Sequence, residues 1–431
     1  MKVVVAQKGA REHFLAARAL HRAGMLAKLV VDWYAPKHPI FQWIGSFRGS
    51  GRGRAAWAAR AEEIPDALVQ AMPLRSLWWK WIQRAGHTGG SYHERALQAD
   101  VAFTKAVARQ DLPPHDGFFG YSYMSLEMLE VERTRGIITM VDQIDPGPVE
   151  FRLVAEEMAG NPGLAGPSRP FPTDYYDRLR REWKLADVLV VNSEWCREAI
   201  IAEGADASKI EVLPLAYEVA QSATTRLQDN RTTGPRSVVS GQWSSSPRSA
   251  ALRVLWLGQV NVRKGIHYLM EAAKLLANES VHFDVVGTIG ILPGAAASAP
   301  SNMTFHGPVS RDRAAEWYRQ ADVFVLPTLS DGFALTQLEA LAHGLPVIVT
   351  PNCGHVVEDG KTGYIIPPRN AQALADAILR FVHNPGLAVE MGSRCREAVK
   401  AYSVDGYAKR LVEIIQKHSE KRVCSPVVSG Q

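Results

Sequence analysis

Residues 330–346 read SDGFALTQLEALAHGLP, a turn that leads into a short helix and then into an apolar strand over residues 345–349. Asp331 stands at the turn, and Glu339 follows about two helical turns later. The start of such a helix leaves backbone N–H groups free and carries a partial positive charge, which suits phosphate, while nearby acids can hold the hydroxyls of a sugar. The stretch therefore predicts a nucleotide-sugar site.

Apolar runs separated by helical patterns extend on both sides of this stretch. In the second half they occupy residues 253–257, 283–286, 303–305, 323–326 and 346–349, and most of them end in Gly or Pro. In the first half they occupy residues 3–6, 29–31, 136–141 and 186–191. Strand and helix alternating at this spacing are typical of parallel sheets with crossover helices. The predicted fold class is α/β, with two Rossmann-like domains that face each other across a cleft.

The length and composition set the domain boundaries. A chain of 431 residues exceeds one ordinary core, so two domains of about 150–200 residues each are expected. Residues 1–220 form the predicted acceptor-side domain. Residues 221–250, rich in Ser, Thr, Arg, Gln, Gly and Pro, are predicted to be a flexible linker or insertion. Residues 251–400 form the predicted donor domain, and residues 401–431 a helix able to pack back on the first domain, followed by a disordered tail.

Charge, cysteine content and missing motifs narrow the function classes. A net charge of +5 does not suggest a nucleic-acid-binding protein. The four cysteines are far apart and form no CxxC pair, which disfavours a disulfide framework or zinc site and fits a reducing cytosol. No signal peptide or transmembrane span is predicted. Walker loops, GxSxG elbows and a DxD metal motif are absent from the sequence, so no obligatory metal is expected.

A segment rich in tryptophan and basic residues, 74–84, reads LRSLWWKWIQR and has two interpretations. A basic aromatic helix can lie on an anionic membrane surface, which would suit a lipid-linked acceptor and a position at the inner face of the membrane. Alternatively, the tryptophans pack in the first domain while the cations face water. The second interpretation is favoured, and flotation with anionic liposomes distinguishes the two.

Motifs in the second half resemble the donor domain of family-4 glycosyltransferases, which are retaining enzymes with the GT-B fold. The likeness rests on Gly258 with the RKG of residues 263–265, on residues 321–327 (ADVFVLP), on the acid-x7-acid stretch 331–339, and on residues 358–364 (EDGKTGY). Residues 186–193 and 209–215 resemble the end of the family's first domain. Together these motifs cover about residues 180–385. The resemblance implies transfer of a hexose-type sugar from a nucleotide diphosphate, with no obligatory cofactor.

The resemblance also implies roles for individual side chains. Lys264, near the start of a predicted helix, matches the family's diphosphate-binding lysine, and Arg263 can assist with its planar fork. Glu339 matches the acid that accepts hydrogen bonds from ribose hydroxyls. Asp331 matches the acid that contacts the donor sugar, although the family more often has Glu there and Asp is also a favoured helix N-cap. These three charged positions, Lys264, Asp331 and Glu339, are the predicted catalytic residues. The remaining predicted donor contacts are Gly258, Gly332, Phe333, Ala334, Leu335 and Thr336.

The sequence departs from the family pattern at two places. Gln259 follows Gly258 where many members have Arg, so that cation is either missing or replaced by Arg263. Residues 140–146 lack the histidine that members often carry near the sugar. On this side Asp142, Gln143 or Asp145 is expected to hold a sugar or acceptor hydroxyl, and Gly9 to bring backbone close to the ligands.

These observations predict a retaining glycosyltransferase with a glycan, a lipid-linked molecule or a small molecule as its acceptor. Two alternatives share the donor site. A sugar-nucleotide epimerase or hydrolase would act on the donor alone, and a non-catalytic sugar-nucleotide-binding protein would bind the donor without forming a product. The binding protein is encouraged by Gln259, by Asp331 and by the missing histidine. The transferase is favoured because the donor-side motifs occur together and in order.

Overall fold

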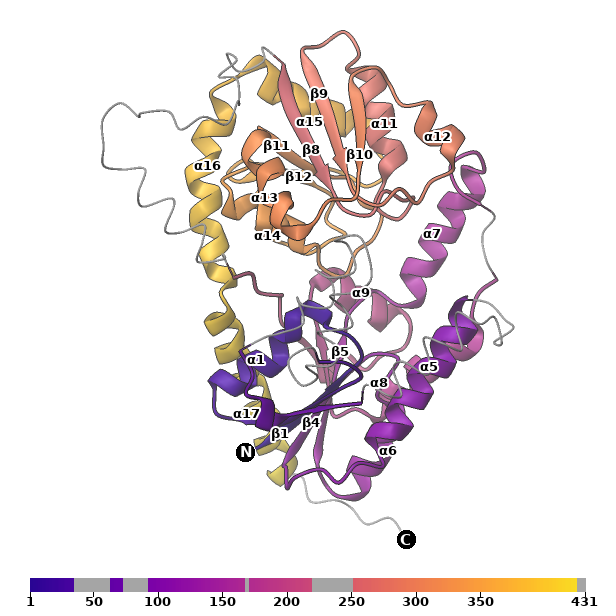
Figure 1. Ribbon diagram of the computed structural model, residues 1–431, viewed down its shortest axis with the longest axis vertical. Helices are drawn as coiled ribbons and strands as arrows, with labels where there is room; N and C mark the ends of the chain where they lie inside the picture. Colours follow the sequence, from indigo (N-terminus) through magenta and orange to yellow (C-terminus); the bar gives the residue numbers. More distant parts are fainter. Residues whose placement is uncertain (35–62, 73–91, 167–169, 219–250, 425–431) are drawn as a thin grey trace, which may run out of the picture.

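The structure, a computed structural model, describes residues 1–34, 63–72, 92–166, 170–218 and 251–424. These residues form two α/β domains, each with a parallel sheet between helices (Figure 1). The fold class predicted from the sequence is confirmed. The predicted linker and the tryptophan-rich segment 74–84 lie outside the described residues.

The first domain has a seven-stranded parallel sheet in the order β3-β2-β1-β4-β5-β6-β7. The switch point lies between β1 and β4, because the strand that follows β1 is added on one side of this pair and the strand that follows β4 is added on the other. The strands are β1 (Val3–Gln7), β2 (Leu26–Val31), β3 (Val69–Ala71), β4 (Gly117–Tyr121), β5 (Ile138–Gln143), β6 (Val188–Val191) and β7 (Ile210–Val212). The helices are η1 (Arg11–Phe14), α1 (Leu15–Arg22), η3 (Asp66–Leu68), α5 (Tyr92–Val107), α6 (Leu126–Thr134), α7 (Pro148–Gly160), α8 (Thr173–Leu185), α9 (Glu194–Ala202) and η4 (Ala207–Lys209).

The second domain has a six-stranded parallel sheet in the order β10-β9-β8-β11-β12-β13, with the switch point between β8 and β11. Its strands are β8 (Leu252–Leu257), β9 (Val281–Val286), β10 (Met303–Gly307), β11 (Val323–Leu326), β12 (Val347–Val349) and β13 (Gly363–Ile365). Its helices are α11 (Ile266–Leu275), α12 (Pro293–Ala297), α13 (Arg311–Gln320), α14 (Leu335–Ala342), α15 (Ala371–His383), α16 (Leu387–Ala398) and η6 (Val399–Tyr402).

The central strands are apolar because helices cover both faces of each sheet. Every residue of β1, β4, β5 and β6 is buried, and so is every residue of β11 and β12. This is why these strands read as continuous apolar runs rather than as alternating patterns. The polar residues that follow the strands are thereby placed at the carboxyl ends of the sheets, where parallel α/β domains bind ligands.

Two helices cross from one domain to the other. The last helix, α17 (Val404–Cys424), packs beside α1 of the first domain. Its Arg422 donates to the Ile137 carbonyl (2.7 Å) and contacts the Asp187 carboxylate (3.0 Å). In the opposite direction α7 leaves the first domain and runs beside α11 and α12 of the second (Figure 1). The chain therefore joins the domains on two sides of the region where the sheets face each other.

No helix within the described residues is long and apolar enough to cross a membrane. Cys196, Cys353 and Cys395 are buried and not paired in disulfides.

Candidate functional site

The turn between β8 and α11 carries the two predicted diphosphate-binding cations. Gly258 follows β8 directly, and its N–H donates to the Val286 carbonyl (3.0 Å). The Asn261 side chain accepts a hydrogen bond from the Lys264 N–H (3.0 Å), which closes the turn. Gly265 has φ +75°, and a Cβ there would lie 1.9 Å from the Pro327 carbonyl oxygen. The turn is thus pressed against the end of β11, and only glycine fits at its last position.

Lys264 and Arg263 both meet the carboxylate of Asp331. Lys264 Nζ forms an ion pair with it, and Arg263 Nη1 lies 3.3 Å from Asp331 Oδ1. Arg263 also donates to the Ser330 carbonyl (3.2 Å). Burial, and then the neighbouring guanidinium, lower the pKa of Lys264. The Glu150 carboxylate acts in the opposite direction and raises the pKa of Lys264. In this structure Asp331 is therefore a counter-ion of the two cations.

The loop before α14 presents backbone donors beside these charges. Among the described residues, the N–H groups of Gly332 and Phe333 have no hydrogen-bond partner. The Ala334 N–H, in contrast, donates to the Cys353 carbonyl (3.1 Å). A Cβ on Gly332 would lie 2.1 Å from the Ile144 carbonyl oxygen of the first domain, so this loop touches the opposite domain. Two of the predicted donor N–H groups are thus not used by any described residue, and a third is already used.

The helix α14 holds the other predicted donor residues. Leu335 and Thr336 form its first turn and are half-buried. One carboxylate oxygen of Glu339 accepts a hydrogen bond from the Tyr318 hydroxyl (2.8 Å). The Tyr318 ring stacks on His343 with a centroid distance of 5.1 Å. Glu339 is therefore held in place by a buried tyrosine, and its second carboxylate oxygen makes no hydrogen bond to any described residue.

On the first domain's side, Asp145 is the predicted residue that reaches the space between the domains. Its Oδ1 accepts from the Tyr123 hydroxyl (2.7 Å) and from the Gly147 N–H (2.9 Å). Tyr123 and Asp145 meet because the ends of β4 and β5 are paired, with Tyr121 opposite Asp142. Gln143 is fully buried and holds the loop by donating to the Asp145 carbonyl (2.8 Å).

Two other predicted acceptor-side residues, Asp142 and Gly9, contact other residues of the first domain. Asp142 is 2% exposed, and burial together with nearby Glu12 raises its pKa well above the usual range. The Gly9 N–H donates to Asp32 Oδ1 (2.7 Å). Neither residue lines the cavity described next. Their expected contacts with a ligand stay a prediction.

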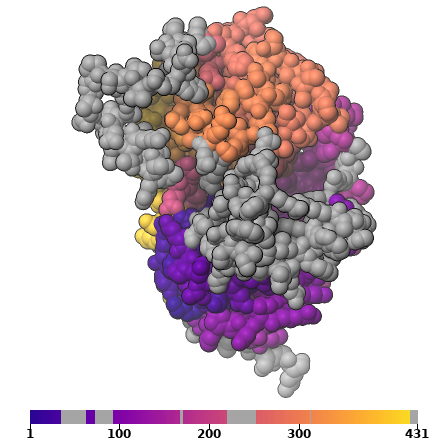
Figure 2. Space-filling view, in the orientation of Figure 1, coloured from indigo at the N-terminus to yellow at the C-terminus, as the bar shows by residue number. Residues whose placement is uncertain are grey.

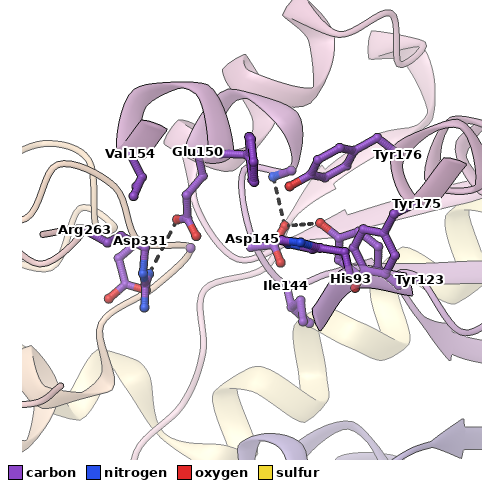
Figure 3. A pocket seen from close by; sticks show the side chains of 13 residues that line it. His93, Tyr123, Ile144, Asp145, Glu150, Val154, Tyr175, Tyr176, Arg263 and Asp331 are labelled. Carbon is purple, nitrogen blue, oxygen red and sulfur yellow. Dashed lines mark hydrogen bonds and ion pairs between the residues drawn. The ribbon is translucent and has the colours of Figure 1, made fainter. Parts of the chain in front are cut away.

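A cavity of about 540 Å³ lies between the two domains at the Asp331 loop. In Figure 2 the second domain (orange) lies above the first (indigo to purple), and Figure 3 shows the side chains that project into the cavity from both. Its volume lies in the usual range for a small-molecule site. It is lined by His93, Tyr123, Ile144, Asp145, Gly147, Glu150, Phe151, Val154, Tyr175, Tyr176, Arg263, Asp331 and Gly332.

Three side chains that sequence reasoning missed connect the first domain to the Asp331 loop. Glu150, in the first turn of α7, accepts from the Ser330 hydroxyl (3.0 Å) and lies 3.5 Å from Arg263. Trp195 Nε1 donates to Ser330 Oγ (3.0 Å), and Ser193 Oγ donates to the Gly332 carbonyl (2.7 Å). One signal was available for Glu150, because a Gly-Pro helix start directly after the predicted strand 136–141 places an acid at the carboxyl end of the sheet.

Within the described part of the chain, no group of three or more His, Cys, Asp or Glu side chains is arranged to hold a metal ion. The expectation that no metal is required stays a prediction.

With this geometry in place, comparison with known proteins identifies the second domain. Residues 251–384 match the family described as glycosyl transferases group 1. The match lies within the second domain. The recognition made from the sequence motifs is thereby confirmed, and the matched segment contains Arg263, Lys264, Asp331 and Glu339.

Two curated relatives share one name. A D-inositol 3-phosphate glycosyltransferase of Arthrobacter sp. (strain FB24) is 34% identical over 152 residues, which cover 32% of this chain and 36% of the relative. A protein of the same name from Xylanimonas cellulosilytica is 26% identical over 256 residues, covering 55% of this chain and 58% of the relative. The chain thus spans between a third and three fifths of the length of these relatives.

Solved structures share the whole two-domain fold. Sucrose-phosphate synthase from Thermosynechococcus elongatus has a TM-score of 0.61 at 20% identity, covering 98% of this chain and all of that one. HepE from Anabaena, solved in complex with UDP-glucose, has a TM-score of 0.57 at 14% identity and covers 97% of this chain and all of its own. At such identities the likeness shows the fold, which is the GT-B arrangement.

Proposed function

We propose that this protein is a retaining glycosyltransferase that moves a hexose-type sugar from a nucleotide diphosphate to an acceptor bound on the first domain's side of the cavity. The observation that carries the proposal is the meeting of Arg263 and Asp331 at one end of a cavity whose other walls come from the first domain, with Lys264 paired to Asp331. The group 1 domain supplies these three residues, and the two-domain fold supplies a second surface for the acceptor.

The donor diphosphate would bind where the cations and free N–H groups lie together. Lys264 and Arg263 would exchange Asp331 for phosphate oxygens, and the N–H groups of Gly332 and Phe333 would donate to the same group. Once Lys264 binds phosphate, the Asp331 carboxylate would be free to accept a hydrogen bond from a hydroxyl of the donor sugar. Glu339 would accept hydrogen bonds from the ribose hydroxyls through the carboxylate oxygen that is not bonded to Tyr318.

In the transfer step an acceptor hydroxyl oxygen forms a bond to the anomeric carbon of the sugar, and the bond from that carbon to the diphosphate oxygen breaks. The acceptor proton passes to an oxygen of the departing diphosphate, so no side-chain nucleophile is required. Lys264, Arg263 and the loop N–H groups stabilise the negative charge that develops on the leaving group. Positioning of the two substrates next to each other lowers the activation barrier further.

Domain closure would protect this step from water. The contacts of Glu150, Trp195 and Ser193 with the Asp331 loop bring the two domains together at the reacting centre. Exclusion of water strengthens the electrostatic contacts and limits hydrolysis of the donor.

A panel of nucleotide sugars tests the proposal. UDP-glucose is the first choice because HepE binds it, and other UDP-, GDP- and ADP-sugars complete the panel. A donor that binds the native state raises the melting temperature by mass action. The stabilising donor is then incubated with and without sugar acceptors, and the anomeric configuration of the product is read by NMR.

We expect stabilisation by at least one donor and a product that keeps the donor's anomeric configuration. Consumption of the donor without an acceptor would point to the hydrolase or epimerase instead. Binding without any product from a broad glycan and polyol panel would point to a binding protein. An inverted product would contradict the retaining mechanism.

A further inference from the structure

We propose that the acceptor side of the cavity binds an uncharged or amine-bearing sugar ring and selects against phosphorylated acceptors. This inference rests on the proposed transferase function and names the acceptor class of the same site. It is carried by the side chains that the first domain places in the cavity (Figure 3).

One wall of the cavity is aromatic. Tyr123 and Tyr175 stack in parallel with a centroid distance of 4.5 Å and an interplanar angle of 11°. Phe151 and Tyr176 meet edge to face at 6.1 Å, and His93 packs against the edge of Tyr175 at 5.7 Å. Tyr123 and Tyr176 are buried while Tyr175 is half-buried, so Tyr175 keeps ring surface open to a ligand. The C–H face of a sugar ring carries partial positive charge and suits the negative face of such a ring.

Acidic side chains also line the cavity. Asp145, Glu150 and Asp331 project into it, and among the described lining residues Arg263 is the one arginine or lysine. Arg263 is already shared between Glu150 at 3.5 Å and Asp331 at 3.3 Å. In the proposed complex the donor diphosphate forms ion pairs with this guanidinium and with the Lys264 ammonium. The acceptor is then left facing carboxylates that no other lysine or arginine among the described lining residues neutralises.

Carboxylates in this position favour ligands that donate hydrogen bonds. The Oδ1 atom of Asp145 is occupied by Tyr123 and Gly147, whereas its Oδ2 makes no hydrogen bond to any described residue. A sugar hydroxyl or ammonium group can donate to that oxygen. A phosphate monoester has only acceptor oxygens when ionised, and it would place about two negative charges beside partly buried carboxylates.

The acceptor proposed for this chain differs from the acceptor in its relatives' name. Those proteins are named for inositol 3-phosphate, which is anionic. The described cavity of this chain offers such a phosphate no free cation, and it offers a ring face and a carboxylate instead. The family match covers residues 251–384 of the second domain and does not include the first-domain residues that line the cavity.

The test compares acceptors matched in shape and differing in charge. Transfer from the stabilising donor is measured to the methyl glycoside, the amino sugar and the 6-phosphate of the same hexoses, and to inositol and inositol phosphate. Four full-length proteins are used: wild type, Tyr175→Phe, Tyr175→Ala and Asp145→Asn. Asp177→Asn is the matched charge control, because Asp177 is exposed on α8 and lies outside the cavity. Melting temperatures verify folding, and titration with the free nucleotide verifies the donor site separately.

We expect kcat/KM for neutral and amine-bearing rings to exceed that for phosphorylated ones by at least about tenfold. Tyr175→Ala should raise the acceptor KM about tenfold while Tyr175→Phe leaves it nearly unchanged, and neither should change nucleotide affinity. Asp145→Asn should narrow the discrimination against phosphates, and Asp177→Asn should not. A preference for phosphorylated acceptors, or no transfer to any neutral or amine-bearing ring by a protein that transfers elsewhere, would overturn the inference. If the wild-type protein does not bind the nucleotide at all, that result would instead count against the proposed function.

Discussion

Asp331 shows how one side chain can serve the free protein and the proposed complex in turn. Two cations side by side in a half-closed site repel each other and need a counter-charge. Asp331 and Glu150 supply it, one from each domain. Sequence motifs predicted Lys264 and Asp331 as members of one site, because both lie in loops after neighbouring strands of one sheet. They did not reveal Glu150, whose contact with Ser330 joins residues 180 positions apart across the domain interface.

This view of Glu150 leads to a prediction about nucleotide affinity. Its carboxylate is attracted to Arg263 and repels an incoming diphosphate, so Glu150→Gln should bind UDP about threefold to tenfold more tightly. The amide can still accept the Ser330 hydrogen bond. Isothermal titration of UDP measures the change, with Glu156→Gln as the control because Glu156 is exposed and paired with Arg369. Unchanged or weaker binding would mean that Glu150 does not compete with the diphosphate.

At the scale of elements, the turn between β8 and α11 fixes where the cations stand. The alternation of strands and helices was predictable, since buried parallel strands read as apolar runs and glycines mark the turns. The role of each glycine was less predictable. Gly265 and Gly360 both have positive φ, +75° and +72°, yet only Gly265 is pressed against backbone, at the Pro327 carbonyl. A sequence signals a turn, but the element packed against that turn depends on the folded sheet.

The two glycines give a matched test of that packing. Gly360→Ala meets open space and should cost about 1 kcal/mol from its backbone conformation alone. Gly265→Ala adds a clash with backbone and should cost at least about 2 kcal/mol more. Urea unfolding of the two variants and wild type measures both losses. Equal losses would show that the turn can move away from β11 without penalty.

At the scale of the whole molecule, α7 ties the domains together away from the cavity. Its Glu157 accepts from the Tyr268 hydroxyl (2.6 Å), faces His267 Nε2 at 2.9 Å, and pairs with Arg369 Nε at 3.0 Å. His267, Tyr268 and Arg369 belong to the second domain. The sequence could predict two facing domains, because both sheets have their own pattern. It could not predict this contact, because Glu157 looks like any exposed helical glutamate until the domains are docked.

The His267 contact should make stability depend on pH. Burial lowers the pKa of His267 below its usual value, outweighing the Glu157 carboxylate beside it. The unfolded chain therefore binds more protons than the folded one just below about pH 6.5, so stability falls as the pH drops through this range. His267→Gln should lose less melting temperature between pH 7.5 and 5.5 than wild type, by about 2 °C. His383→Gln, at an exposed position, is the control. Equal losses in all three proteins would exclude this histidine as a source of acid sensitivity.

The central claim is that this protein transfers a sugar from a nucleotide diphosphate held by Lys264. The most direct measurement is the rate of labelled product formation from the stabilising donor and its best acceptor, in wild type, Lys264→Ala and Lys361→Ala. Lys361 is exposed in a surface loop of the same domain and controls for loss of a positive charge. We predict at least about a hundredfold lower rate for Lys264→Ala, with an intact fold, and an unchanged rate for Lys361→Ala. A folded Lys264→Ala protein that turns over near the wild-type rate would contradict the account.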